Sequence, residues 1–143
     1  MRVDHIGYAV KDIEAALKKF ALLGYRPCGE LTHDEGRGVS IRFMEDPAGV
    51  RVELISPLGE GSPVSGWLAK NGNSPYHICC ESGDMERDIG ALKGNGFMVV
   101  QAPSSAPAMG GRRVAFLYSV ETGLLELVEG EGSRLIERDD FAS

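Results

Sequence analysis

Two histidines and two glutamates recur at a nearly constant separation along this chain. His5 precedes His77 by 72 residues, and Glu53 precedes Glu126 by 73 residues. Imidazole nitrogens and carboxylate oxygens bind first-row divalent metals, and such ions act as Lewis acids toward carbonyl oxygens. If a pseudo-twofold axis relates the two occurrences, each side chain meets its counterpart at one point. The spacing therefore predicts a divalent metal site made of two imidazoles and two carboxylates.

The sequence around these residues is itself repeated. The segment Asp4–Val10 aligns with Tyr76–Ser82 at an offset of 72, and Val52–Ile55 aligns with Leu125–Val128 after one inserted residue. Each copy contains an alternating strand, a helical pattern after a capping aspartate such as Asp12, and three further extended segments. Two copies are too few for a solenoid. We therefore predict an α+β fold in which two tandem βαβββ units form one cupped mixed sheet with helices on its outer face.

The predicted boundaries follow from this repeat. The first unit covers about residues 1–57, a linker helix with a Ser cap and an early Pro covers about 62–71, and the second unit covers about 74–130. A tail follows at 131–143. All 143 residues are expected to form a single domain, since a chain of this length can bury a substantial core. The segment 102–111 contains turn residues without periodicity and predicts a mobile loop.

Composition narrows the classes of function. The net charge is −6 and the basic residues are scattered, which argues against nucleic acid as a partner. No apolar run is long enough for a membrane span and no signal peptide is recognisable, so a cytoplasmic location is expected. The cysteines Cys28, Cys79 and Cys80 lack metal-ligand spacing and should be reduced thiols. His33 has no counterpart in the other copy and should be solvated.

Side-chain alternation places the candidate ligands on one face of the predicted strands. His5 alternates with apolar residues such as Ile6, which are suited to pack under a helix. Glu53 lies between Val52 and Leu54 in the same way. The predicted ligands therefore line the cupped side of the sheet, opposite the helix-covered face.

The repeated units, the opening segment Asp4–Asp12 and the closing segment Leu124–Glu129 together resemble the vicinal oxygen chelate superfamily. This superfamily includes glyoxalase I, methylmalonyl-CoA epimerase, extradiol dioxygenases and antibiotic-resistance proteins. The resemblance covers about residues 1–130. Dioxygenases fit less well because they typically use three protein ligands, and resistance proteins generally lack the ligands. The resemblance implies one metal ion held by four residues: His5, Glu53, His77 and Glu126.

Two metal-dependent enzymes of the superfamily remain. The ligand set is similar to bacterial glyoxalase I, so the main interpretation is a glyoxalase I-like lyase that converts a 2-oxoaldehyde hemithioacetal into a 2-hydroxyacyl thioester through an enediolate. Glu126 would then be the ligand that also shuttles the proton, with Glu53 as its partner on the other face of the substrate. The alternative is methylmalonyl-CoA epimerase, which segments 53–63 and 110–117 resemble. Against it, Ile41 stands where the epimerase has a glutamate proposed as the base, and Glu53 stands where it often has Gln. A ligand-binding protein on the same fold is a third possibility.

The same resemblance suggests the cofactor and the substrate contacts. Nickel or cobalt is preferred as the divalent metal, with manganese or zinc as alternatives. The partner would be a small-molecule thiol adduct or an acyl-CoA thioester, and a homodimer is expected. The arginines could meet an anionic thiol cofactor or a CoA phosphate, although the favoured alternative for each is a solvated surface cation. The aromatic and aliphatic residues would form an apolar wall. The candidate substrate contacts are Arg51, Ile41, Phe43, Arg112, Arg113 and Phe116.

Overall fold

The computed structural model describes residues 1–130, and the predicted tail at 131–143 lies outside the described residues. The chain divides into two compact units. We call His5–His77 the first unit, and Met1–Asp4 together with the described residues from Ile78 onward the second unit.

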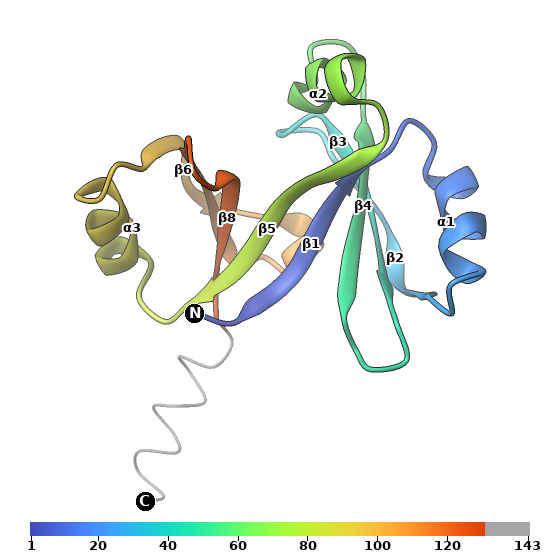
Figure 1. The fold of residues 1–143 in the computed structure, drawn as a ribbon, viewed down its shortest axis with the longest axis horizontal. Helices are drawn as coiled ribbons and strands as arrows, with labels where there is room; N and C mark the ends of the chain where they lie inside the picture. The colour runs from blue at the N-terminus through green and yellow to red at the C-terminus, as the bar shows by residue number, and fades with distance from the viewer. Residues whose placement is uncertain (131–143) are drawn as a thin grey trace, which may run out of the picture. The chain divides into compact units, whose positions relative to one another are not determined.

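The first unit contains one βαβββ element and the linker helix (Figure 1). Its strands are hydrogen-bonded in the order β2-β3-β4-β1, with β1 parallel to β4 and the other pairs antiparallel. The predicted helix at 62–71 is present as α2. The elements are β1 (Val3–Ala9), α1 (Ile13–Ala21), β2 (Arg26–Asp34), β3 (Val39–Glu45), β4 (Arg51–Pro57), α2 (Pro63–Asn71) and the beginning of β5 (Ser74–Ser82).

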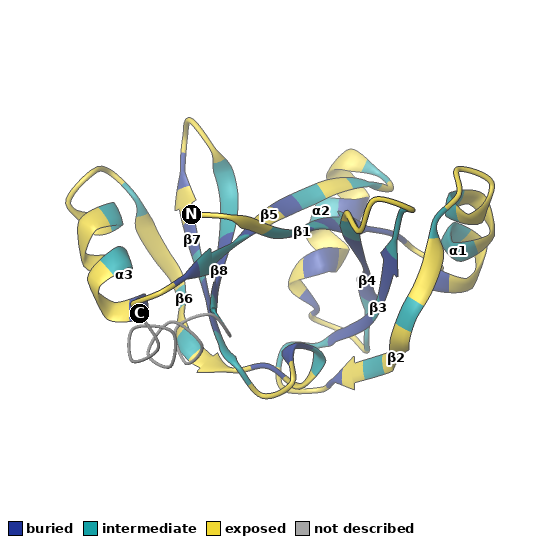
Figure 2. Ribbon diagram, turned by 90° about the horizontal axis from the view of Figure 1, so that it is seen from below, coloured by how far each residue is buried: buried dark blue, intermediate teal, exposed yellow. Residues whose placement is uncertain are grey.

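Local signals explain where α1 begins and what it covers. The Asp12 side chain accepts a hydrogen bond from the Ala15 backbone N–H at 3.2 Å, as its position in the sequence predicts. Gly24 follows the helix with a φ of 90°, a conformation that glycine adopts without steric cost. The buried core of the unit, Val10, Ile13, Met44, Val52 and Leu54, is joined by the half-buried apolar side chains of α1. In Figure 2, β3 and β4 are accordingly mostly buried, whereas α1 keeps an exposed outer side.

The second unit repeats this plan. Its strands are hydrogen-bonded in the order β5-β8-β7-β6, with β5 parallel to β8 and the other pairs antiparallel. Asp84 caps the helix of this unit, α3 (Met85–Lys93), by accepting a hydrogen bond from the Arg87 backbone N–H at 3.2 Å. Met85 and Leu117 belong to the core that the helix covers. The elements after β5 are α3 (Met85–Lys93), β6 (Met98–Ser105), the 3-10 turn η1 (Pro107–Met109), β7 (Arg113–Ser119) and β8 (Gly123–Glu129).

The predicted α+β class with two tandem βαβββ units is confirmed. One expectation is wrong, because the segment 102–111 is not a structureless loop. β6 continues to Ser105 by pairing with β7, and the 3-10 turn after it buries Ala106 and Met109. Strand pairing and burial of these apolar side chains override the Pro, Ser and Gly content from which the loop was predicted.

The structure also describes His33 and the three cysteines, for which the sequence predicted a solvated side chain and reduced thiols. His33 is exposed, as predicted, and its Nδ1 lies 2.8 Å from the Ser40 hydroxyl. All three cysteines carry reduced thiols. Within residues 1–130, every helix is too short or too polar to traverse a lipid bilayer.

Candidate metal centre

The strand register of the first unit sets which side chains share a face. Val52 and Leu54 of β4 point into the core under α1. Glu53, between them, therefore points to the opposite face. Its register partner on β3 is Phe43 and its partner on β1 is Gly7. The predicted alternation on β4 is thus present, and it directs the Glu53 carboxylate away from the helix.

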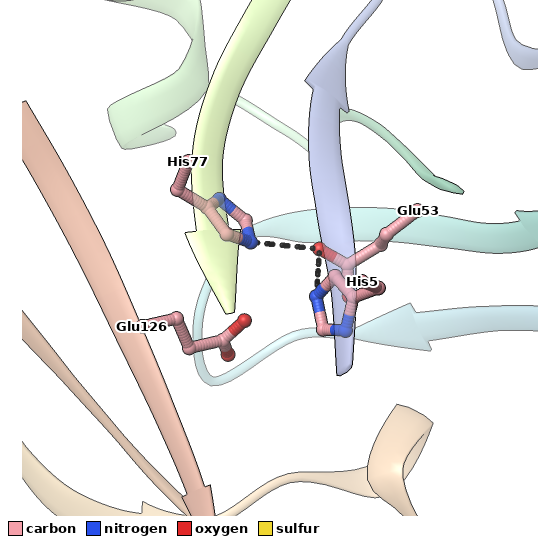
Figure 3. A group of neighbouring side chains, drawn as sticks. All are labelled: His5, Glu53, His77 and Glu126. Atoms are coloured by element: carbon pink, nitrogen blue, oxygen red, sulfur yellow. Dashed lines mark ion pairs between the residues drawn. The ribbon is translucent and has the colours of Figure 1, made fainter. Parts of the chain in front are cut away.

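Three predicted ligands lie together within the first unit, where they form one buried cluster (Figure 3). Glu53 Oε1 lies 3.6 Å from His5 Nε2 and 3.4 Å from His77 Nε2. The exposed fraction is 0% for both imidazole side chains and 4% for the carboxylate side chain. Residues far apart in the sequence thus present two nitrogens and one oxygen to the same small volume.

The electrostatics of the cluster favour an ionised carboxylate. Burial alone would raise the pKa of Glu53, because a charge is poorly solvated in the interior. The attraction of the nearby His5 imidazole, joined by that of His77, outweighs burial and holds this pKa well below its usual range. Glu53 therefore carries its negative charge across the physiological pH range, which is the form that binds a cation.

Aromatic side chains hold the two imidazoles in place. The His5 ring meets the edge of the Phe43 ring at a centroid distance of 5.1 Å, and the guanidinium of Arg51 lies 4.2 Å from the centre of the same phenyl ring. The His77 ring packs against Tyr76 at 5.4 Å, and Tyr76 packs in turn against Trp67 of α2 at 5.3 Å. The cluster is therefore built on strands and braced by rings, which limits the freedom of each ligand.

Tyr76, Trp67 and Gly7 contribute to this site although they are not among the predicted site residues. A signal for Gly7 was available, since it aligns with Cys79 in the second copy and so breaks the repeat beside the ligands. No comparable pattern marks the two aromatic residues, because their contact joins α2 to β5 and depends on the fold.

The donor set of this cluster fits a divalent cation. One ligand atom from each of His5, Glu53 and His77 lies within 4.8 Å of the others. Imidazole nitrogen with carboxylate oxygen is a donor combination that first-row divalent metals accept. The buried negative charge of Glu53 would be compensated by such an ion. The residues present are therefore compatible with the predicted metal.

The fourth predicted ligand belongs to the second unit. Glu126 lies on β8 and is buried, with an exposed fraction of 5%. Its neighbour Leu127 packs in the core with α3, so the Glu126 side chain points to the face opposite that helix. Its register partner on β7 is Phe116. The position in the second unit therefore corresponds to that of Glu53 in the first.

The other predicted substrate contacts have different surroundings. Ile41 is paired with Ile55 and lies on the same face of its unit as Glu53 and Phe43. Arg112 donates hydrogen bonds from Nε to the Met109 carbonyl and from Nη1 to the Glu129 carbonyl.

Arg113 is the predicted contact that does not share the face of Glu126. It forms ion pairs with Glu86 of α3 and with the Glu129 carboxylate. Arg113 alternates with Val114 and therefore lies on the helix-covered face, together with the core residue Ala115. Arg112 precedes β7, so the alternation of that strand does not place its side chain on either face.

Comparison of the sequence with protein families shows the family to which the chain belongs. The sequence profile of the glyoxalase/bleomycin resistance protein/dioxygenase superfamily matches residues 4–116. The chain belongs to this superfamily. The resemblance recognised in the sequence is therefore confirmed, and so is the prediction that the protein is an enzyme of this superfamily.

Relatives of this superfamily member are named as epimerases. The ethylmalonyl-CoA/methylmalonyl-CoA epimerase of Cereibacter sphaeroides is 33% identical over 118 residues, which cover 82% of this chain and 87% of that protein. The mitochondrial methylmalonyl-CoA epimerase of Bos taurus is 30% identical, covering 88% of this chain and 73% of that protein. A solved structure of a Streptomyces coelicolor methylmalonyl-CoA epimerase variant, in complex with 2-nitronate-propionyl-CoA, is 29% identical with a TM-score of 0.78, covering 92% of this chain and 98% of the other.

These relatives correct the main functional interpretation. The predicted glyoxalase I-like lyase activity is wrong, because the similar proteins and solved structures that carry a functional name are named as methylmalonyl-CoA epimerases. The physical reason for the error is that both reactions begin with proton removal next to a carbonyl. They therefore need the same kind of electrophilic metal site, and the donor set does not distinguish them. The superfamily usually binds a divalent metal, which agrees with the cluster described above.

Proposed function

We propose that this enzyme is a metal-dependent epimerase of 2-carboxyacyl-CoA thioesters such as methylmalonyl-CoA. The observation that carries the proposal is the buried cluster of His5, Glu53 and His77 in a chain that shares 33% identity with an ethylmalonyl-CoA/methylmalonyl-CoA epimerase. The complex of a 29% identical epimerase with 2-nitronate-propionyl-CoA supports an acyl-CoA thioester as the class of substrate.

In this proposal the metal is held by His5, Glu53 and His77, with Glu126 of the second unit as the fourth ligand. The internal repeat supports Glu126, since it occupies in β8 the position that Glu53 occupies in β4. When bound, a divalent ion supplies Lewis-acid stabilisation of the negative charge that develops on the thioester oxygen. Nickel or cobalt is our preferred ion, with manganese or zinc as alternatives, because nitrogen and oxygen donors in this number suit these metals.

The reaction requires a proton to leave carbon 2 of the acyl group on one face and to return on the other. The resemblance aligns Ile41 with the glutamate proposed as the epimerase base, and the buried alkyl side chain of Ile41 accepts no proton. Two repeated carboxylates remain as candidates. We assign the transfer to Glu126, with Glu53 as its counterpart on the other face. The product has the same composition as the substrate, because one proton leaves carbon 2 and one returns, so no co-reactant is needed.

Substrate positioning is assigned to the face that carries the ligands. Arg51 is half-buried against the Phe43 ring, and its guanidinium can pair with the free carboxylate of a 2-carboxyacyl group. Ile41, Phe43 and Phe116 would exclude water from the acyl group, which strengthens every charge interaction around it. Arg112 is the remaining cationic candidate for a CoA phosphate.

The test is exchange of the carbon 2 proton. Metal-depleted protein is reconstituted with nickel, cobalt, manganese or zinc and incubated with methylmalonyl-CoA in D2O, and deuterium in the substrate is followed by mass spectrometry. We expect exchange that depends on metal and is lost in a His5→Ala variant. A His33→Ala variant is the control, because His33 is exposed and lies outside the cluster. Absence of exchange with all four metals would contradict the proposal and favour a ligand-binding protein.

Three further expectations from the sequence remain predictions. A homodimer is to be tested by light scattering, and a single cooperative domain by one unfolding transition seen with several probes. The cytoplasmic location is to be tested by cell fractionation.

A further inference from the structure

The glycine opposite Glu53 in the sheet provides the space that the His77 ring occupies. Gly7 of β1 is the register partner of Glu53. A Cβ atom built on Gly7 would lie 2.2 Å from His77 Cε1 and 2.5 Å from each of the ring nitrogens. Real Cβ atoms essentially never approach another atom closer than 3.0 Å. The edge of the imidazole therefore lies directly against the backbone of β1, in the volume of an absent side chain.

The backbone conformation does not explain this glycine. Gly7 is not among the glycines with positive φ, so an alanine could adopt its dihedral angles without strain. The repeat makes the same point, because the matching residue of the second copy is Cys79, which pairs with Glu126 as Gly7 pairs with Glu53. A βαβββ unit thus accepts a side chain at this position. What forbids one in the first unit is the ring of His77.

The ring has little room to move aside. Its side chain is fully buried, and it packs against His5 at a centroid distance of 5.6 Å and against Tyr76 at 5.4 Å. Its Nε2 atom lies 3.4 Å from Glu53 Oε1. A methyl group on Gly7 would have to displace the ring by about an ångström, which is the scale at which a metal ligand loses its geometry.

We infer that Gly7 is a positioning residue, whose missing side chain lets the His77 imidazole lie against β1 and reach Glu53. Gly7 thereby sets the metal affinity of the cluster. This inference rests on the proposed role of the cluster as a metal site. It assigns Gly7 no contact with the substrate.

The test is a double-variant cycle measured on the metal-depleted and the metal-bound full chain. We expect Gly7→Ala to lower the affinity for nickel(II) or cobalt(II) about 10–100-fold in isothermal titration, the usual effect of losing a group that orients a metal ligand. We also expect it to lower the urea midpoint of the metal-depleted protein. In a His77→Ala background the ring is gone, so adding Gly7→Ala should leave the urea midpoint unchanged. Gly66→Ala is the matched control, because a Cβ there meets no atom within 4 Å, and its metal affinity should equal that of the parent.

Each outcome decides the inference. If Gly7→Ala alone fails to fold, recovery of the fold in the Gly7→Ala, His77→Ala double variant supports it, and failure of the double variant overturns it. Unchanged metal affinity in Gly7→Ala overturns it, as does an equal loss of urea midpoint with and without the His77 ring. The epimerase proposal fails separately. If the parent protein exchanges no substrate proton while the cycle shows coupling, the positioning role stands and the reaction must be reassigned.

Discussion

Replacing Glu53 by glutamine tests the charge at the centre of the cluster with almost no change of shape. Glu53 Oε1 faces the Nε2 atoms of His5 and His77 at 3.6 and 3.4 Å, and all three side chains are buried. At these distances a protonated imidazole and a carboxylate attract each other by about 5 kcal/mol at an effective dielectric constant of about 20, before desolvation is counted. The charge on Glu53 therefore contributes strongly to the folding free energy of the metal-depleted protein.

The net effect is smaller than this attraction. Breaking a buried ion pair by removing one partner costs about 3–5 kcal/mol. We expect Glu53→Gln to lower the unfolding free energy of the metal-depleted protein by about 3 kcal/mol at pH 7, at the low end of this range because the amide oxygen keeps a partial negative charge beside the imidazoles. With a urea m-value of about 1.5–3 kcal/mol/M, the urea midpoint falls by roughly 1–2 M.

The lowered pKa of Glu53 predicts how the stability difference between parent and variant changes with pH. The pKa of Glu53 is lower in the folded protein than its ordinary value of 4.5. Its contribution to stability is therefore complete above pH 4.5 and is lost as the pH falls from there through the folded pKa, because the unfolded chain binds the proton first. The difference between parent and variant should narrow below about pH 4.5.

Urea unfolding followed by circular dichroism, on chelator-treated protein at several pH values, measures this difference. Glu81→Gln is the matched control, because Glu81 pairs with the exposed Arg2 and such surface pairs contribute at most about 1 kcal/mol. The reasoning is refuted if Glu53→Gln is as stable as the parent at pH 7, or if its deficit stays constant from pH 7 to pH 3.

Four further outcomes are expected. Glu126→Gln should keep near-normal metal content in elemental analysis yet lose about 10²–10⁴ in exchange rate, the usual value of a positioned general base, and wild-type exchange would exclude Glu126 as the base. His77→Ala should bind metal weakly and regain part of its exchange activity as the metal concentration is raised, and full activity at stoichiometric metal would remove His77 from the ligand set. Leu54→Ala should lower the unfolding free energy by about 2–5 kcal/mol in urea titrations, because Leu54 is fully buried under α1, and a loss below 1 kcal/mol would contradict its place in the core. His33→Ala should bind metal like the parent in isothermal titration, and a weaker affinity would bring His33 into the site.

The internal repeat was sufficient to predict the order of elements. The alignment of Asp4–Val10 with Tyr76–Ser82 predicted two βαβββ units, and both are present with their helices capped by Asp12 and Asp84. These features are local, because a cap and a strand alternation depend on residues a few positions apart. Pairing partners are not local, and the segment 102–111 shows the consequence. Its composition predicted a mobile loop, but β6 pairs with β7 up to Ser105.

The choice of reaction was not contained in the ligand set. Two histidines and two glutamates at a fixed offset predicted a metal site, and any reaction that removes a proton next to a carbonyl could use it. Similarity along most of the chain to proteins named as epimerases, rather than the four ligands, overturned the lyase interpretation.

The sequence alone determined the identity of the candidate ligands. The residue types and their spacing are sufficient to show that His5 and Glu53 recur as His77 and Glu126. Only the tertiary structure decided how the side chains within each unit meet. It places the His77 ring on the backbone of Gly7, Tyr76 against that ring, and Arg113 on the helix-covered face. The physical reason is that spacing along a chain specifies the face on which a side chain lies, whereas contact between strands depends on register and on the volume that neighbouring side chains leave empty.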